Sequence, residues 1–360
     1  MLPLKRLTRR ILGLHPVAGS LRSLSKGVAT IFMLHRFADR DLGNPGHDPG
    51  DLRELLRFLR RQGYRLLSLQ DLLSAVEQKE PLARAVAFTV DDGYLDFQSA
   101  GAAVFTHFDC PVTVFLTTGF VDGNDWLWWD RIEYLIENTE LREVELDLPL
   151  GLRSLRWAGP DQRAAVTRAV VTEVKRLPTA RGLRLIDRLA ARLEVDVPER
   201  PPERYSALTW DQVRSLERQG VSFGPHTVTH PILSRAPDEQ ARWEIRESWR
   251  RVQDALAAPV PVFCYPNGTP DSFSVREQRV LKASGIAAAV TAVSGYLRSS
   301  HFAPDSPGAR YALPRFPLGG HYRRHLGIVA GIERWRRFDD DGFQRRVASW
   351  WPASSGQAVI

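Results

Sequence analysis

The sequence predicts an α/β fold in which a mostly parallel sheet closes into a β/α barrel. Short apolar runs alternate with amphipathic helical segments along most of the 360 residues, which is typical of parallel strands joined by helices. About eight of these runs are strand candidates, and that number favours a barrel over an open sheet. Polar residues follow several of the runs directly, at the end of a barrel where active sites form.

Four strand candidates lie in the N-terminal third of the chain. They are the apolar runs at 29–34, 64–67, 85–90 and 112–116. Between the first two, leucines from Leu52 to Leu59 fall on one face of a helix that Gly63 closes. Ser68, with Asp71 three residues later, is typical of a helix N-cap and predicts a helix through Val76.

The alternation breaks at about 126–205 and then resumes. This stretch opens with Trp126-Leu127-Trp128-Trp129, and it indicates a mostly helical insertion. Its tryptophans are expected to pack, with the alternative that some of them line a sugar site. The later helices are expected at 209–216, 238–256 and 275–284, and the later strands at 221–223, 260–264, 286–290 and 311–316. The predicted organisation is a basic arm at 1–28, a barrel at 29–320 that holds the insertion, and a helical tail at 321–360.

The net charge of +7 is concentrated at the N-terminus. The first 26 residues hold six lysines and arginines and no acid, so the rest of the chain carries only +1. Without an interleaved basic and aromatic patch, this distribution argues against nucleic-acid binding. Leucines alternate with the cations, which leaves two interpretations open: a frayed terminus, or an amphipathic arm on an anionic membrane surface.

The expected location is the cytoplasm, with or without peripheral contact at the inner membrane. The apolar run Ile11-Leu12-Gly13-Leu14 is too short for a secretory signal peptide. Cys110 and Cys264 are the only cysteines, so no disulfide framework is expected and a reducing compartment fits.

Two adjacent carboxylates end the run at 85–90, in Asp91-Asp92-Gly93. Alone, this sequence indicates a solvated turn. Adjacent side chains of an extended chain point to opposite sides, so one acid can hold a metal while the other takes a proton. Downstream, His226 and His230 are four residues apart, which on a helical turn puts both rings on one side. Two histidines and a carboxylate form a facial metal site with open positions.

The pairing of Thr89-Val90-Asp91-Asp92-Gly93 with His226-Thr227-Val228-Thr229-His230 resembles the polysaccharide deacetylase family, carbohydrate esterase family 4. Phe263-Cys264-Tyr265-Pro266-Asn267-Gly268 resembles that family's third motif. The resemblance covers about 29–320 apart from the insertion. It implies a distorted β/α barrel of about seven to eight strands. It also implies a metal-dependent hydrolase that removes N-acetyl groups from an amino-sugar oligosaccharide, exopolysaccharide or lipid-linked glycan.

The resemblance assigns roles by position. Asp92, His226 and His230 would bind one divalent metal ion, zinc in the first place, with cobalt, nickel or iron as alternatives. Asp91 would be the general base that takes a proton from the attacking water. The backbone N–H of Asn267 would donate to the oxyanion.

Several positions depart from the family pattern or stay open. Many members carry an arginine where this chain has Cys264. Arg315 is the candidate substitute, with a surface ion pair as its alternative. His35 is either a pocket wall or a structural histidine. The general acid stays open among three histidines, which are His321, His301 and His325.

Two other functions stay open beside deacetylation. One is hydrolysis of another non-peptide C–N bond, such as that of a cyclic amide. The other is a degenerate member that binds glycan without cleaving it, which the missing arginine at Cys264 favours.

Overall fold

The computed structural model describes residues 25–123, 126–148 and 151–335. The centre is a parallel sheet with the strand order β10-β1-β3-β4-β7, and β2 pairs separately with β3. Its strands are β1 Thr30–Leu34, β2 Arg65–Leu66, β3 Ala85–Val90, β4 Val112–Leu116, β7 Ser222–Pro225 and β10 Phe316–Pro317. A second parallel pair consists of β8 Val262–Cys264 and β9 Ala288–Val290.

Hydrogen bonds outside the regular ladders join the second pair to both edges of the sheet. On one side, the Val260 N–H donates to the Phe223 carbonyl at 2.8 Å, which links β8 to β7. On the other side, the Leu313 N–H donates to the Ala289 carbonyl at 2.8 Å, just before β10 begins. The parallel strands therefore close on themselves, and the predicted distorted β/α barrel is confirmed.

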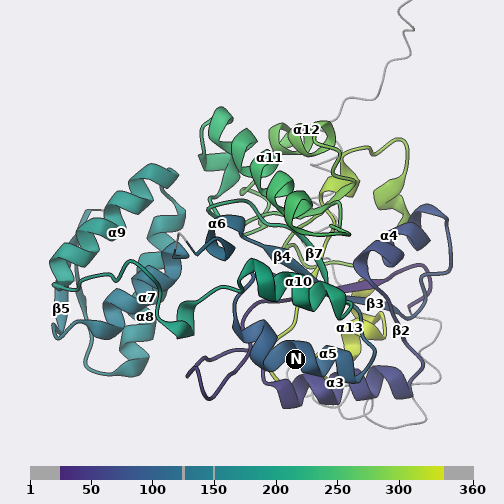
Figure 1. Ribbon diagram of the computed structural model, residues 1–360, viewed down its shortest axis with the longest axis horizontal. Helices are drawn as coiled ribbons and strands as arrows, with labels where there is room; N and C mark the ends of the chain where they lie inside the picture. The colour runs from purple at the N-terminus through teal and green to yellow at the C-terminus, as the bar shows by residue number, and fades with distance from the viewer. Residues whose placement is uncertain (1–24, 124–125, 149–150, 336–360) are drawn as a thin grey trace, which may run out of the picture.

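Amphipathic helices cover the outside of the barrel (Figure 1). They are α3 Pro49–Arg61, α4 Leu69–Glu77, α5 Ala102–His107, α10 Trp210–Arg218, α11 Asp238–Ala255 and α12 Val275–Ala283. The leucines from Leu52 to Leu59 form the buried face of α3, as their spacing predicts. The Ser68 hydroxyl accepts a hydrogen bond from the Asp71 N–H at 3.0 Å, which confirms the predicted cap of α4.

The insertion forms a lobe beside the barrel, at the left of Figure 1. Three helices, α7 Trp128–Asn138, α8 Pro160–Lys175 and α9 Thr179–Leu193, pack around their own apolar cluster, in which Ile132, Val170 and Leu189 are fully buried. The prediction of a mostly helical segment missed an antiparallel hairpin, β5 Glu143–Leu148 and β6 Gly151–Arg156. A hairpin of two short strands carries little periodic signal, so helical spacing on either side dominated the prediction.

The predicted strand at 311–316 is wrong. Residues Ala309–Tyr311 form a 3₁₀ turn, and regular pairing starts only at Phe316. Pro314 and Pro317 lack the N–H that a continuous ladder requires, so the segment touches its neighbours through single bonds. Arg315 therefore precedes the last strand rather than ending it.

Short helical turns follow the barrel, including α13 Leu326–Val329. Residues 336–360 of the predicted tail and residues 1–24 of the predicted arm lie outside the described residues. Within the described ranges, no helix combines the length and apolar character that a membrane span requires.

Candidate active site

The two acids leave β3 in different directions. The strand is buried along its whole length, and the Asp91 N–H still donates to the Leu34 carbonyl of β1 at 2.9 Å. Asp92 then has φ of +78° and Gly93 has φ of +88°, so the chain turns sharply. A Cβ on Gly93 would lie 2.9 Å from Leu116, so both the turn and the packing require glycine there.

The two histidines lie in an irregular loop after β7, not on a helical turn as predicted. Thr227 and His230 both have positive φ, of 66° and 55°. The Thr227 hydroxyl accepts a hydrogen bond from the His230 N–H at 3.1 Å, which closes the loop. The rings meet because of this loop, with 3.1 Å between their Nε2 atoms.

A buried carboxylate of α11 holds this loop. Glu244 is fully buried and accepts hydrogen bonds from the Val228 N–H at 2.7 Å and from the Thr229 N–H at 3.0 Å. Its other oxygen accepts from the Thr229 hydroxyl at 2.5 Å. Sequence reasoning missed Glu244, because on the helix pattern it is an ordinary acid between apolar positions.

Asp92, His226 and His230 converge on one point. The Asp92 Oδ1 atom lies 3.4 Å from His226 Nε2 and 3.5 Å from His230 Nε2. It is buried and has no hydrogen-bond partner among the described residues. His226 Nδ1 donates to the Cys264 carbonyl at 2.7 Å, which turns Nε2 toward Asp92 and His230. Two imidazoles and a carboxylate oriented in this way fit a divalent transition metal.

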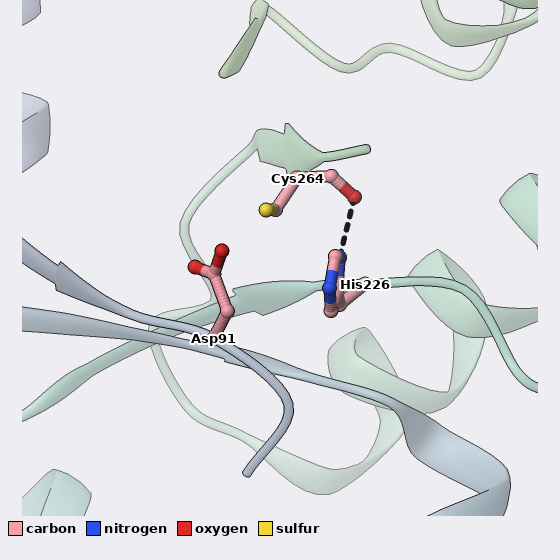
Figure 2. Close-up of side chains that lie close together, drawn as sticks. All are labelled: Asp91, His226 and Cys264. Carbon is pink, nitrogen blue, oxygen red and sulfur yellow. Dashed lines mark hydrogen bonds between the residues drawn. The ribbon is translucent and has the colours of Figure 1, made fainter. Parts of the chain in front are cut away.

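A second group, Asp91, His226 and Cys264, faces inward from three strand ends (Figure 2). Its donor atoms already have partners. His226 Nδ1 donates to the Cys264 carbonyl, and the Cys264 sulfur accepts from the Arg315 Nη2 at 3.2 Å. The Asp91 carboxylate is bound by Arg315 as well. This group therefore positions Asp91 and His226 and is not a second metal site.

Arg315 forms a buried two-pronged ion pair with Asp91. Its Nη1 and Nη2 donate to the two Asp91 oxygens at 2.7 Å and 2.8 Å, and its Nε donates to the Thr291 carbonyl at 2.8 Å. The side chain is only 1% exposed, so the alternative of a surface ion pair is wrong. Burial raises the pKa of Asp91, but the Arg315 guanidinium outweighs burial and holds that pKa below its usual range. Asp91 is therefore an ionised carboxylate held in a fixed orientation.

The histidines expected as general acids lie elsewhere, and among the described residues His35 is the one other histidine that lines the pocket with His226 and His230. His35 Nε2 lies 3.8 Å from Asp91 Oδ2, and its side chain is 45% exposed. His301 Nδ1 bonds to the Arg298 backbone and His325 Nε2 to that of Gly319, while His321 is exposed. Asn267 lines the pocket too, with φ of +58° and a buried Nδ2 that has no partner among the described residues.

The insertion supplies another part of the wall of this pocket, whose volume is about 530 Å³. The Trp129 ring lies 4.5 Å from the His230 ring, and its Nε1 donates to the Tyr94 hydroxyl at 3.0 Å. That hydroxyl donates to Asp130 Oδ2 at 2.7 Å. Burial raises the pKa of Asp130 to about 8. Of the tryptophan cluster, Trp126 packs against Tyr134 and only Trp129 reaches the pocket.

The family model described as polysaccharide deacetylase matches residues 78–289. Among solved structures, the chain resembles the Streptococcus pyogenes deacetylase PplD in complex with acetate, with TM-score 0.51, 16% identity and coverage of 81% of this chain and 92% of that one. It resembles IcaB from Ammonifex degensii, with TM-score 0.53, 13% identity and coverage of 85% and 97%. At such identities these structures support the fold alone. No curated protein sequence matches the chain significantly.

Proposed function

The chain belongs to the polysaccharide deacetylase family, and from this premise we propose that it removes N-acetyl groups from amino sugars of a glycan. It is a hydrolase of carbon–nitrogen bonds other than peptide bonds. The observation that carries the proposal is the placement of the Asp92, His226 and His230 donor atoms beside the Asp91–Arg315 pair.

Asp92, His226 and His230 would hold the divalent metal, for which we propose zinc, with cobalt, nickel or iron as alternatives. When bound, such an ion polarises an acetamide carbonyl and lowers the pKa of water. The hydrogen bond from His226 Nδ1 to the Cys264 carbonyl fixes the ring so that Nε2 points toward Asp92 Oδ1 and His230 Nε2, where the metal would be held.

Asp91 would take a proton from the water whose oxygen attacks the acetyl carbon. Arg315 fixes the carboxylate and keeps it ionised. The Asn267 N–H would donate to the carbonyl oxygen as negative charge develops there. His35 would then give a proton to the amine nitrogen as the C–N bond breaks, because its imidazole lies 3.8 Å from Asp91 in the open pocket. The products are acetate and a free amino sugar.

The Arg315 geometry weakens the interpretation of a non-catalytic glycan-binding member. That interpretation depended on Cys264 at the family's arginine position. Arg315 supplies a guanidinium to Asp91 from another segment, so the base has its ion partner. The substrate would be an N-acetylated oligosaccharide, polysaccharide or lipid-linked glycan. The basic arm supports a cytoplasmic location at the inner membrane surface, which we also propose.

Acetate release tests the proposed function. The purified chain, loaded in turn with zinc, cobalt, nickel and iron, is assayed against N-acetylglucosamine oligomers and against small cyclic amides. We expect acetate from the sugars and no ring opening of the amides. Ring opening without acetate would favour the cyclic-amide alternative, and tight sugar binding without turnover at any metal loading would favour the binding protein.

A further inference from the structure

The pocket wall contributed by the insertion carries charges that the deacetylation chemistry does not use. α7 and α8 and the end of the insertion supply eight lining residues, which are Trp129, Asp130, Glu133, Thr167, Arg168, Val171, Lys175 and Arg204. None of them belongs to the motifs that place the metal ligands or the base. The Trp129 ring of this wall lies 4.5 Å from the His230 ring, so a substrate bound beside the proposed metal ligands also contacts this wall.

Three of the four acids that line the pocket already have a partner, and the fourth is the proposed metal ligand Asp92. Asp91 binds Arg315, and Asp92 lies between the two metal-ligand histidines. Asp130 accepts from the Tyr94 hydroxyl, and burial raises its pKa to about 8, so it is largely neutral at neutral pH. Glu133 binds Arg204 at 2.5 Å. The pocket therefore has no spare negative charge for a further cation.

Two cations of α8, Arg168 and Lys175, make no ion pair among the described residues. They lie two helical turns apart on the stripe that also carries Val171, so they face the same cavity. The Lys175 ammonium is close enough to act electrostatically on both Asp92 and His230. A divalent metal at the ligands adds positive charge to the same space.

Arg168 and Lys175 are both exposed, so with a neutral glycan they keep only water as a hydrogen-bonding partner. An anionic group satisfies them, and a positive cleft with low-dielectric walls attracts such a ligand. We propose that the substrate is an acidic glycan, whose phosphate or carboxylate oxyanion is bound by Arg168 and Lys175 while the neighbouring N-acetyl group reaches the metal ligands. This inference rests on the proposed deacetylase function for the position of the acetyl group. The anion site itself is a specificity-determining part of the insertion.

The spacing of the two cations indicates how the charge is presented. Seven residues of helix span about 10 Å along the axis. An oligosaccharide with a charge on alternate sugars therefore matches both positions with extended side chains. A single phosphate reaches both only if the two side chains converge on it. A phosphorylated substrate and a carboxylate-bearing substrate therefore distinguish the two sources of the oxyanion.

The test compares three substrates and three forms of the full chain. The substrates are neutral N-acetylglucosamine oligomers, the same oligomers carrying a phosphate, and an oligosaccharide that alternates N-acetylglucosamine with glucuronate. The forms are the unmodified chain, the double variant Arg168→Gln/Lys175→Gln, and a matched control, Arg184→Gln/Arg188→Gln. The control removes two exposed cations of α9 that do not line the pocket. Both acetate release and binding by calorimetry are measured.

For one or both acidic substrates, we expect the α8 double variant to raise KM and Kd by about tenfold or more, with kcat nearly unchanged. For neutral oligomers both variants should behave like the unmodified chain. The charge-preserving swap Arg168→Lys/Lys175→Arg should restore acidic-substrate binding, which separates charge from packing.

Equal KM and Kd for neutral and acidic oligomers, or equal effects of the α8 and α9 variants, would overturn the anion site. Absence of binding to both acidic substrates would also overturn it. These outcomes are separable from failure of the proposed function. Acidic-glycan binding that is lost in the α8 variant, without acetate from any substrate, would keep the anion site and reject deacetylation. Acetate released from neutral oligomers alone would support deacetylation and reject the anion site.

Discussion

The two walls of the pocket differ in how their charges are arranged. On the barrel wall, hydrogen bonds fix two of the proposed functional groups: Arg315 donates to both oxygens of Asp91, and the Cys264 carbonyl accepts from His226 Nδ1. On the insertion wall, Arg168 and Lys175 have no ion partner among the described residues. Pre-oriented groups suit chemistry, because they need no reorganisation when charge develops. Unpaired groups at the mouth suit recognition, because the ligand supplies the missing partner.

We therefore expect substitutions in the barrel wall to change the free energy of unfolding and turnover together. Substitutions of Arg168 and Lys175 in the insertion wall should change substrate specificity.

Replacing Arg315 by Met should have the largest effect. It leaves the Asp91 charge buried and unpaired, which should lower the free energy of unfolding by about 3–5 kcal/mol. Turnover should fall by about 10²–10⁴-fold, because the base loses its orientation. Because Arg315 keeps the pKa of Asp91 low, the contribution of the pair is present above about pH 4 and is lost as the pH falls below it. Denaturant unfolding at several pH values measures this.

A matched control for Arg315→Met is Arg310→Met. Arg310 forms an ion pair with Glu77 at 2.6 Å, and both side chains are partly exposed. Its loss should change the free energy of unfolding by less than about 1 kcal/mol. Equal effects of the two substitutions would show that the Asp91 pair is not held as described.

Asp130→Asn should change how stability depends on pH. Burial raises the pKa of Asp130 to about 8, so in the folded chain it keeps a proton that the unfolded chain releases near pH 4. The unfolded state then binds fewer protons, and the metal-free wild-type protein should lose stability as pH rises from about 4 to 8. Asn cannot ionise and still accepts from the Tyr94 hydroxyl. The variant should therefore gain a few kcal/mol over wild type across this range.

Denaturant unfolding of the metal-free proteins at pH 5 and pH 8 measures the difference. The exposed Asp187, changed to Asn, serves as the control and should give a difference that is independent of pH. A constant difference between Asp130→Asn and wild type would mean that Asp130 is ionised in the fold.

Glu244→Gln should weaken metal binding without touching a ligand. Gln keeps one acceptor but loses the charge that holds two N–H groups and a hydroxyl of the His226–His230 loop. Supporting groups of this kind are worth about 10–100-fold in metal affinity. Calorimetric zinc titration measures it, with the exposed Glu239→Gln of the same helix as control. Unchanged affinity in both variants would remove Glu244 from the account of the loop.

The two walls also differ in how far the sequence predicts them. The apolar run at 85–90 corresponds to β3 residue for residue, since a strand buried on both faces gives an uninterrupted signal. The proposed metal ligands Asp92 and His226 lie within two residues of a strand end, and with His230 they are visible as a motif. Arg315 could be predicted as a candidate because Cys264 occupies the position where the family has an arginine. Its ion pair with Asp91 could not be predicted, because it depends on the path of an irregular segment that contains Pro314 and Pro317.

The insertion wall could not be predicted in this way. Lys175 and Asp130 are separated from the barrel motifs by a lobe with its own apolar cluster, and no local pattern states which face of that lobe meets the barrel. In the sequence, Asp130 has the pattern of an ordinary acid on a helix. Its hydrogen bond from the Tyr94 hydroxyl, which in turn accepts from Trp129, is visible only in the structure. His35 was recognisable as a pocket residue, but its distance from Asp91 is set by the register of β1 on β3.

In the proposed mechanism Asp91 accepts a proton and Asp92 binds the metal, and substituting each acid separately distinguishes these two tasks. Asp91→Asn and Asp92→Asn are purified in parallel, and bound metal per chain is measured beside acetate release. Asp91→Asn should keep its metal and lose turnover by about 10²–10⁴-fold, because only the proton acceptor is removed. Asp92→Asn should lose the metal itself, because its Oδ1 faces both histidines. Equal loss of metal in the two variants, or full turnover by Asp91→Asn, would contradict the account.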